Sequence, residues 1–309
     1  MVNNKVISII ICTYNRARFL PLALADWYRQ DAPKELYELI IINNNSPDTT
    51  ESICLEFIHQ HPDFPIKYFV ETQQGLSYAR NRGIQEVSGL YCCFVDDDGL
   101  PATDYVTVLY NYIQLHPLIA GIGGRVDPYY IDGEPNWMSP FLEPLVAKFN
   151  AGDQVLILEK NIYPFGCNMC YKTELLHHIG GFDIALGRMG NSGDAGEEKD
   201  VFKKIRKQGG QVIYLPILIV KHIIEAQRLS PEYIHKLGIG LGKSEHTRLH
   251  KDGRMALYKK QLELLIKWIG AYVLACYYFI RQEPAKANML ILFRNAVNSG
   301  WRTWKSTKK

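Results

Sequence analysis

Three consecutive carboxylates, Asp96, Asp97 and Asp98, directly follow the uncharged segment Leu90–Val95. Adjacent carboxylates repel one another, and burying their charge costs free energy unless a counter-ion is present. Carboxylate oxygens suit Mg²⁺ or Mn²⁺, and these ions also favour phosphate oxygens. The triplet therefore predicts a divalent metal site. The alternative interpretation is an acidic turn that caps the next helix.

A second group of carboxylates, Glu197, Glu198 and Asp200, opens a predicted helix over residues 197–208. A carboxylate within reach of a hydroxyl can accept its proton, so this group holds the candidate general base. Acids in the first turn of a helix are also stabilised by the helix dipole, which is the alternative interpretation. His222 ends a predicted strand and is either a metal ligand or an ordinary strand-end histidine.

Alternating strand and helix signals must position these groups. Buried strands are predicted over residues 6–12, 39–42, 66–70 and 90–95. Helices are predicted over residues 17–30 and 75–87, and Ser46-Pro47 is typical of a helix start with Ser46 as the N-cap. The alternation predicts an α/β fold with a Rossmann-like, mainly parallel mixed sheet flanked by helices.

Each of three polar segments directly follows one of these strands: Thr13–Arg16, Asn43–Ser46 and Asp96–Asp98. Parallel sheets bind ligands at the carboxyl ends of their strands. We therefore expect the three segments to line one crevice.

The chain after residue 100 continues with strand and helix signals as far as His222 and is helical beyond it. This change predicts two domains, an α/β domain over residues 1–225 and a basic, amphipathic helical appendage over 226–309. The glycine-rich segment 187–196 is predicted to be a lid or acceptor loop. Trp137 lies in the long loop 129–161 and is predicted either to stack on a bound ligand or to pack in a small satellite core.

Six segments, taken in chain order, resemble the motif series of family 2 glycosyltransferases with the GT-A fold. The segments are Ile9-Ile-Ile-Cys-Thr-Tyr-Asn-Arg16, Ile42-Asn-Asn-Asn-Ser-Pro-Asp48, Gly75-Leu-Ser-Tyr-Ala-Arg-Asn-Arg-Gly83, Phe94-Val-Asp-Asp-Asp98, Gly180-Gly-Phe-Asp183 and Gly196-Glu-Glu-Lys-Asp-Val201. The resemblance covers roughly residues 5–225.

This resemblance implies a nucleotide-binding site made by the ends of several strands. Residues that would line the base and ribose of the nucleotide are Cys12, Thr13, Tyr14 and Asn15. The resemblance places Asn44 on the base and Arg80 near the base or the diphosphate. An amide both donates and accepts hydrogen bonds, so Asn44 could pair with uracil, and the expected donor is a UDP-sugar.

The resemblance also implies metal-dependent transfer with inversion at the sugar carbon. Asp98 matches the direct ligand of a Mn²⁺ or Mg²⁺ ion that bridges the diphosphate, and His222 matches a histidine that completes the metal shell. Asp96 and Asp97 would serve the ribose and support the metal site, and Asp96 is also a candidate metal ligand. Three acids compete for the role of general base, in the order Glu198, Glu197 and Asp194.

The net charge of +3 divides unevenly along the chain. Residues 251–309 carry a net charge of +9, and the remainder carries −6. The basic tail predicts either a surface that rests on an anionic membrane or a helical hairpin packed on the catalytic domain or on a second subunit. Its longest uncharged apolar run, Trp268–Ile280, has 13 residues. A helix that spans a membrane needs about 20 residues, so this run is too short.

Several other features limit the partners and the compartment. A charge balance this small does not indicate a nucleic-acid partner. Seven irregularly spaced cysteines are typical of buried thiols in a reducing cytoplasm. No targeting segment is expected, and the protein is predicted to be cytoplasmic, associated at most with the inner face of the plasma membrane. The stretch Gly238–Lys243, together with Arg228 and Arg248, could present cations to a diphosphate.

These patterns predict an inverting, metal-dependent glycosyltransferase that moves a sugar from a nucleotide-diphosphate donor to a hydroxyl of a saccharide or lipid-linked acceptor. A natural setting is the biosynthesis of cell-surface polysaccharide. One alternative is a catalytically silent protein that binds a sugar nucleotide or a partner. The other is a nucleotidyltransferase on a similar sheet, which would need a glycine-rich phosphate loop where this chain has Cys12–Arg16.

Overall fold

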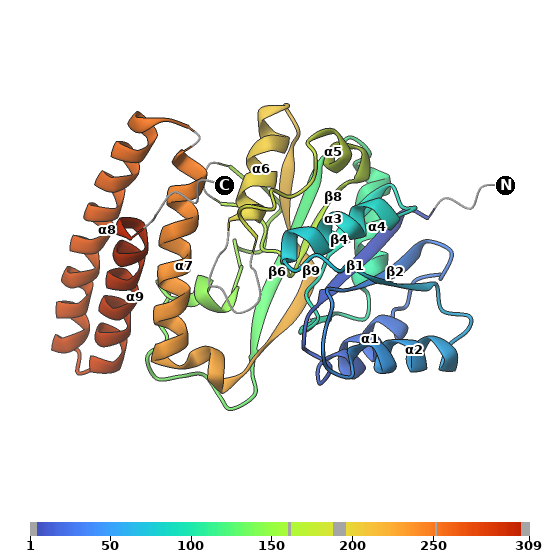
Figure 1. Cartoon of the computed structure of the whole chain (residues 1–309), viewed down its shortest axis with the longest axis horizontal. Coiled ribbons are helices and arrows are strands. Elements are labelled where there is room, and N and C mark those ends of the chain that lie inside the picture. Colours follow the sequence, from blue (N-terminus) through green and yellow to red (C-terminus); the bar gives the residue numbers. More distant parts are fainter. Residues whose placement is uncertain (1–4, 160–161, 188–195, 251, 304–309) are drawn as a thin grey trace. The chain divides into compact units, whose positions relative to one another are not determined.

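The computed structural model describes residues 5–159, 162–187, 196–250 and 252–303 (Figure 1). The chain divides into two compact units. We call them the sheet unit, residues 1–129, 147–184 and 197–223, and the helical unit, residues 130–146, 185–196 and 224–309. Residues 130–146, which fall within the predicted first domain, therefore belong to the helical unit.

The sheet unit is built on one mixed sheet whose strands run in the order β3-β2-β1-β4-β8-β6-β9-β5, with β7 paired to β9. The strands are β1 (Ile7–Thr13), β2 (Tyr37–Asn43), β3 (Ile66–Val70), β4 (Tyr91–Phe94), β5 (Gly99–Pro101), β6 (Gly121–Tyr130), β7 (Leu156–Ile157), β8 (Met169–Lys172) and β9 (Val212–Ile224). Strands β1 to β4 are parallel to one another, whereas β8 runs antiparallel to both β4 and β6. The short strands β5 and β7 pair antiparallel with β9.

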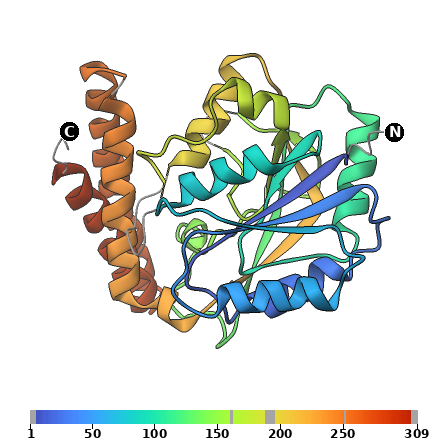
Figure 2. The same cartoon turned by 45° about the vertical axis from the view of Figure 1, so that its right-hand side comes forward.

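Helices cover both faces of this sheet (Figure 2). They are α1 (Leu20–Tyr28), α2 (Thr50–Gln60), α3 (Leu76–Glu86), α4 (Tyr105–Leu115), α5 (Thr173–His178) and α6 (Glu197–Lys207). Successive residues of a strand point to opposite faces. Accordingly Ile9 and Ile11 of β1 pack with α1, α2 and α4, and Ile10 packs with α3, α5 and α6. Burial on both faces explains the continuous aliphatic runs of the parallel strands.

The helix that follows β2 does not begin where the sequence predicts. Helix α2 starts at Thr50, and Ser46 is not its N-cap. The Ser46 hydroxyl instead accepts a hydrogen bond from the Asn15 backbone N–H at 3.0 Å, and the Ser46 N–H donates to Asn43 Oδ1 at 2.8 Å. The cap prediction is wrong because Ser46 is engaged in holding two strand-end loops together.

The helical unit consists mainly of three long helices, α7 (Pro231–His250), α8 (Arg254–Ile280) and α9 (Pro284–Arg302), with 3₁₀ turns at Glu143–Val146 and Ala226–Leu229. Trp137 is buried in the apolar core of this unit, where it belongs to the same cluster as Leu290 and Phe293 of α9. Trp137 is therefore a core residue. The predicted α/β class, with a mixed sheet and a C-terminal helical region, is confirmed.

Two glycines of the Gly238–Lys243 stretch, Gly238 and Gly242, lie in α7 against α9. A Cβ atom on Gly242 would collide with the backbone of Val297 and Trp301, and one on Gly238 would approach the side chain of Ala296 at 2.7 Å. A Cβ atom on Gly300 of α9 would likewise collide with the backbone of Ile239. These glycines let two helix backbones pack closely, which is a different use from the predicted presentation of cations to a diphosphate.

Helix α8 is longer than the uncharged run that the sequence displays. Lys260, Glu263 and Lys267 fall within it, and Glu263 forms ion pairs with both lysines. Among the described residues, α8 is one helix whose length and composition would allow it to cross a membrane.

Candidate active site

The loops that follow β1, β2 and β4 meet at the carboxyl ends of these strands. The Asn44 N–H donates to the Thr13 carbonyl oxygen at 2.9 Å, which joins the loops after β2 and β1. Arg16 then reaches the loop after β4, with its Nε 3.8 Å from Asp97 Oδ1. The three polar segments that the strand pattern assigned to one crevice therefore lie together.

Two asparagines in these loops adopt left-handed backbone conformations, Asn15 with φ 54° and Asn45 with φ 59°. Asparagine tolerates this region better than other residues with a Cβ, yet the conformation still carries a cost. Such backbone positions are retained where surrounding contacts hold them, and here the Asn15 N–H is held by the Ser46 hydroxyl.

Asp96, Asp98 and His222 bring one potential ligand atom each within 4.8 Å of one another. The pairing of β5 with β9 makes this possible, because it aligns Gly99 with His222. His222 Nε2 lies 3.0 Å from Asp98 Oδ1, and both side chains are almost fully buried. Two carboxylates and an imidazole form a ligand set that fits Mn²⁺ or Mg²⁺, so the residues agree with the predicted metal site.

Arg16 is a residue of this site to which the sequence pattern assigned no role. Its guanidinium donates to Asp98 Oδ2 and forms an ion pair with it. Its position at the end of the polar segment after β1 is the signal that could have identified it. The Arg16 guanidinium therefore places a positive charge beside Asp98, the carboxylate that is predicted to bind the metal ion.

The side chain of Asp97, the middle residue of the acidic triplet, has little exposed surface. Burial raises the pKa of the Asp97 carboxyl to about 7, the positive charge of Arg16 opposes the rise, and the negative charge of Asp98 adds to it. The electrostatic environment thus favours a cation near the triplet, since added positive charge would lower the cost of ionising Asp97.

Arg80 forms the centre of a buried charge cluster on the other side of Asp96. Its guanidinium bonds Glu197 Oε1 at 2.8 Å and Glu198 Oε1 at 3.3 Å, and it lies 3.8 Å from Asp96 Oδ1. Burial lowers the pKa of Arg80, but the surrounding carboxylates outweigh burial and hold the pKa above its ordinary value. One cation therefore joins the candidate metal site to the candidate base.

Glu198 differs from its neighbour in exposure. The Glu198 side chain retains 21% of its accessible surface, whereas Glu197 retains 3%. Burial raises the pKa of Glu198 to about 7, Arg80 opposes the rise, and the charges of Glu197 and Asp96 add to it. A carboxyl with a pKa near neutrality is well suited to accept a proton in a reaction at physiological pH.

Gly166 is a second residue that sequence reasoning missed. A Cβ atom at this position would collide with Glu198 Oε1 and with the guanidinium of Arg80. The backbone of residue 166 therefore packs directly against the Arg80–Glu198 pair. No local sequence pattern signals this requirement, because the pair comes from two distant segments.

The predicted nucleotide-binding residues after β1 differ in accessibility. Tyr14 and Asn15 are exposed, whereas Thr13 is buried and Cys12 is partly buried. Burial raises the pKa of the Cys12 thiol to about 12, which keeps the sulfur protonated and unreactive near neutral pH. Tyr14 and Asn15 are therefore the most accessible side chains of this segment.

Asn44 uses both ends of its amide within the chain. Its Nδ2 donates to the carbonyl oxygens of Glu71 and Gln73, and its Oδ1 accepts the Gly75 N–H at 2.8 Å. Gln74 Nε2 adds a fourth contact at 3.3 Å. Asn44 thus anchors the loop that leads into α3, and its pairing with a nucleotide base stays a prediction.

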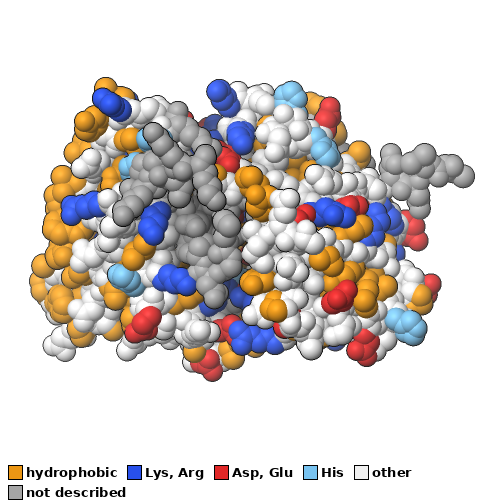
Figure 3. Space-filling model, in the orientation of Figure 1, with side chains coloured by type: hydrophobic (Ala, Val, Ile, Leu, Met, Phe, Trp, Pro, Cys, Tyr) orange, Lys and Arg blue, Asp and Glu red, His pale blue; other side chains and the backbone are white. Residues whose placement is uncertain are grey.

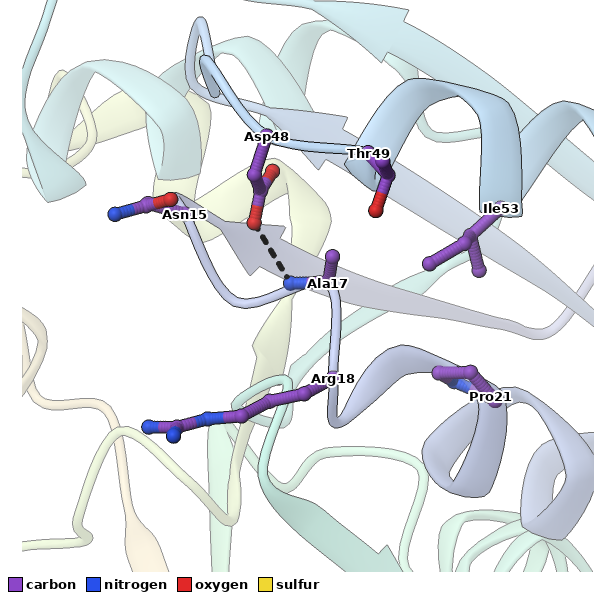
Figure 4. Close-up of a pocket in the computed structure, with 7 residues that line it drawn as sticks. All are labelled: Asn15, Ala17, Arg18, Pro21, Asp48, Thr49 and Ile53. Atoms are coloured by element: carbon purple, nitrogen blue, oxygen red, sulfur yellow. Dashed lines mark hydrogen bonds between the residues drawn. The ribbon is translucent and has the colours of Figure 1, made fainter.

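A cavity of roughly 610 Å³ opens between the loops that follow β1 and β2. Figure 4 shows that a hydrogen bond from the Ala17 N–H to Asp48 Oδ2, 3.0 Å long, ties the two loops together beside it. The side chains of Asn15 and Arg18 point to one side of this hydrogen bond, and Ile53 lies on the other side. The predicted lid segment 187–196 and its candidate base Asp194 fall almost wholly outside the described residues.

Comparisons with known proteins agree with this geometry. Residues 8–180 match the family model described as glycosyl transferase family 2. The chain is 25% identical over 224 residues to a glucosyl-dolichyl phosphate glucuronosyltransferase of Haloferax volcanii, covering 70% of this chain and 68% of that protein. It is 31% identical over 128 residues to a dolichyl N-acetyl-α-D-glucosaminyl phosphate 3-β-D-2,3-diacetamido-2,3-dideoxy-β-D-glucuronosyltransferase of Methanococcus voltae, covering 39% of each.

A similar fold occurs in the mannosyltransferase PcManGT of Pyrobaculum calidifontis, solved with GDP-Man and Mn²⁺. The TM-score is 0.63 at 20% identity, and the match covers 96% of this chain and 87% of that one. This likeness shows that the sheet and its helices have the GT-A arrangement. Because the family model matches more than half of the chain, the protein is a member of glycosyl transferase family 2 and a glycosyltransferase with the GT-A fold.

Proposed function

We propose that the protein is an inverting, metal-dependent glycosyltransferase that uses a nucleotide-diphosphate sugar, with UDP as the expected nucleotide. The observation that carries this proposal is the Arg80 cluster, in which one buried cation contacts Glu198 and lies beside Asp96. The cluster holds the candidate base at a fixed place relative to the candidate diphosphate site. Such fixed placement is what a displacement at a sugar carbon requires.

In the proposed reaction, an acceptor hydroxyl attacks C1 of the donor sugar. A bond forms between the acceptor oxygen and C1, the bond between C1 and the diphosphate oxygen breaks, and Glu198 accepts the hydroxyl proton. The proposed displacement inverts C1, as the family resemblance implies, and this outcome requires the base and the leaving group to lie on opposite sides of C1. Asp96, Asp98 and His222 would hold a divalent cation, which supplies positive charge to the departing diphosphate when bound.

We assign the base to Glu198 in preference to Glu197 on accessibility. Glu197 is buried and bonds Arg80 at 2.8 Å, so its role is to position the guanidinium. The more exposed Glu198 can reach a substrate hydroxyl. Asp194 lies outside the described residues and is not needed for this assignment.

The nucleotide is proposed to lie along the loops after β1 and β2. Tyr14 and Asn15 are accessible there, Thr13 and Cys12 support the loop from within, and Asn44 holds the segment 71–75 beside it. Asp97 is proposed to contact the ribose. Arg80 is more deeply buried than a direct diphosphate ligand would be, so we assign it to positioning the carboxylates.

The proposed acceptor is a saccharide or lipid-linked hydroxyl in the biosynthesis of cell-surface polysaccharide. The names of the two archaeal relatives include dolichyl phosphates that carry a sugar, which makes them lipid-linked sugars. We propose a cytoplasmic protein whose catalytic domain lies within residues 1–225 and is formed by the sheet unit. Residues 226–309 then form a helical region that contacts either the inner face of the membrane or a second copy of the chain.

A panel of nucleotide sugars tests the proposal. The full chain is expected to show a rise in melting temperature with Mn²⁺ and a UDP-sugar, together with slow release of UDP. The same donor without metal, in the presence of a chelator, is the control and is expected to give neither effect. Stabilisation by a GDP-sugar alone would overturn the choice of nucleotide. Undiminished donor turnover after complete chelation would overturn the metal dependence.

A further inference from the structure

Helix α8 of the helical unit presents a second apolar face in addition to the one that packs in the core. One face holds Leu264, Ala271 and Ala275, which are buried among residues of α7 and α9. The other face carries large aliphatic side chains that remain exposed in the described part of the chain. We call this face the α8 stripe and define it as Leu262, Leu265, Ile266, Ile269, Val273 and Ile280.

The stripe is continuous along the helix. At 100° per residue its members fall within an arc of about 100°, and Leu262 and Ile280 lie about 27 Å apart along the axis. Ile266, Val273 and Ile280 are 62%, 66% and 82% exposed. Figure 3 shows hydrophobic side chains gathered along the edge where α8 lies, at the left of the view. A contiguous apolar face of this length marks an interaction surface.

The side chains that border the α8 stripe are tyrosines and cations, which are typical of a surface that contacts lipid. Tyr258, Tyr272 and Tyr277 are exposed beside it, and tyrosine is favoured where apolar chains meet polar headgroups. Arg254, Lys259 and Arg281 are exposed cations on the same helix or directly after it. Glu263 is the one acid between residues 254 and 280, and Lys260 and Lys267 pair with it.

The charge distinguishes a membrane from a second copy of the chain. Residues 251–309 carry a net charge of +9, so a symmetric contact through the stripe would bring two strongly positive regions together. An anionic bilayer would instead attract these basic residues. The helix would also lie in the plane of the interface, because its opposite face is occupied by α9 and cannot meet lipid.

We propose that the α8 stripe is a membrane-docking surface that rests on an anionic lipid bilayer with α8 parallel to it. This inference deepens the proposed function and rests on it for its purpose, since a lipid-linked acceptor is held in the bilayer. The chemistry of recognition is insertion of aliphatic side chains among acyl chains, combined with attraction of Lys and Arg to anionic headgroups.

Flotation of the full chain with lipid vesicles tests the docking surface. The wild type is expected to float with vesicles of equal parts phosphatidylcholine and phosphatidylglycerol, and far less with phosphatidylcholine alone. The double substitution Ile266→Glu with Val273→Glu places two acids in the stripe and should weaken binding by about tenfold or more. The matched control is Leu115→Glu with Leu118→Glu, two highly exposed leucines of the sheet unit, which should leave binding unchanged.

Four outcomes would overturn the proposal. The first two are absence of wild-type flotation and equal flotation of a folded stripe variant. The third is retention of the wild type in the bilayer after alkaline carbonate extraction, and the fourth is a wild-type dimer that the stripe substitutions convert to a monomer. Far-ultraviolet circular dichroism and the melting temperature show whether each variant is folded. A milder double variant, Ile266→Ser with Val273→Ser, replaces the glutamates if they prevent folding.

Donor hydrolysis in the absence of vesicles separates this inference from the proposed function. Stripe variants should hydrolyse the donor as the wild type does and lose transfer to an acceptor embedded in vesicles. Active donor hydrolysis without vesicle binding would overturn the docking surface alone. Vesicle binding without any donor hydrolysis would count against the proposed function alone.

Discussion

In the sheet unit, Arg80, Asp98 and Glu197 are charged side chains with almost no exposed surface, whereas Ile266 and Val273 of the helical unit are aliphatic side chains that are mostly exposed. Both arrangements cost free energy relative to the ordinary distribution, in which charges face water and aliphatic groups face the core. The first is stabilised within the chain by ion pairs. The second has no such compensation among the described residues, so its compensation is expected from outside the chain.

This contrast separates two ways in which a structure marks function. A buried charge cluster is complete in itself and prepares chemistry, because its groups are already held and desolvated. An exposed apolar face is incomplete and prepares binding. Substitutions in the sheet unit should therefore alter catalysis with binding of lipid unchanged, and substitutions on the α8 stripe should do the opposite.

The largest effect is expected from Glu198→Gln, which keeps the shape of the side chain and removes the proton acceptor. The kcat for sugar transfer should fall by about 10²- to 10⁴-fold, the usual contribution of a general base, with the KM for the donor little changed. Steady-state kinetics with the preferred donor measures both. Glu197→Gln is the paired variant, and a greater loss of kcat in that variant would move the base to Glu197.

Asp98→Asn is expected to reduce transfer by roughly 10³-fold, since a metal ion contributes several kcal/mol of charge stabilisation. The rise in melting temperature caused by Mn²⁺ should also disappear, which a structural role alone would not predict. The control is Asp104→Asn, an exposed acid at the start of α4. Mn²⁺-dependent stabilisation that persists in Asp98→Asn would contradict the ligand assignment.

The pH dependence should follow the raised pKa of Glu198, about 7. Below that value the carboxyl is protonated and cannot accept a proton, so kcat should fall by about tenfold for each pH unit on the acid side. The same shift makes the folded state bind this proton more tightly than the unfolded chain. Glu198 therefore lowers the free energy of unfolding as pH rises from 4.5 through 7.

Denaturant titrations at several pH values test the linkage. Glu198→Gln should flatten this part of the dependence of stability on pH, because its side chain does not titrate. A profile that remains unchanged in Glu198→Gln would show that another group is responsible, and the buried Asp97 carboxyl is the alternative, with its pKa also raised to about 7.

The smallest effect is expected from glycine-to-alanine substitutions in the helical unit. Two glycines there allow the effect of helix packing on stability to be distinguished from the effect of helix propensity. Gly300→Ala would place a Cβ against the backbone of Ile239 and should destabilise the chain by about 1–3 kcal/mol. Gly270→Ala in α8 meets no atom within 4 Å and should stabilise it by about 0.5–1 kcal/mol. Equilibrium unfolding in urea measures both. Equal effects of the two substitutions would contradict the close packing of α7 on α9.

Much of the sheet unit could be predicted because its signals are local. The run Val6–Cys12 is a strand in the structure within one residue at each end, since burial on both faces of a parallel sheet requires continuous aliphatic residues. The short strands β5 and β7 could not be predicted, because two or three residues carry no period. The local pattern predicts Ser46 as a cap because it does not reveal that a loop 31 residues away also needs the Ser46 hydroxyl.

The sequence by itself determined the α/β class, the three polar strand ends and the acids that are proposed for the candidate site, because hydrophobic period and position after a strand are encoded in neighbouring residues. Only the tertiary structure decided that Arg80 bonds Glu197, 117 residues away, and that Gly166 must lack a side chain. The tertiary structure likewise decided that Gly238 and Gly242 of α7 serve helix packing. It also decided which face of α8 is left exposed. These outcomes depend on which distant segments cross in space, and no short-range pattern records that crossing.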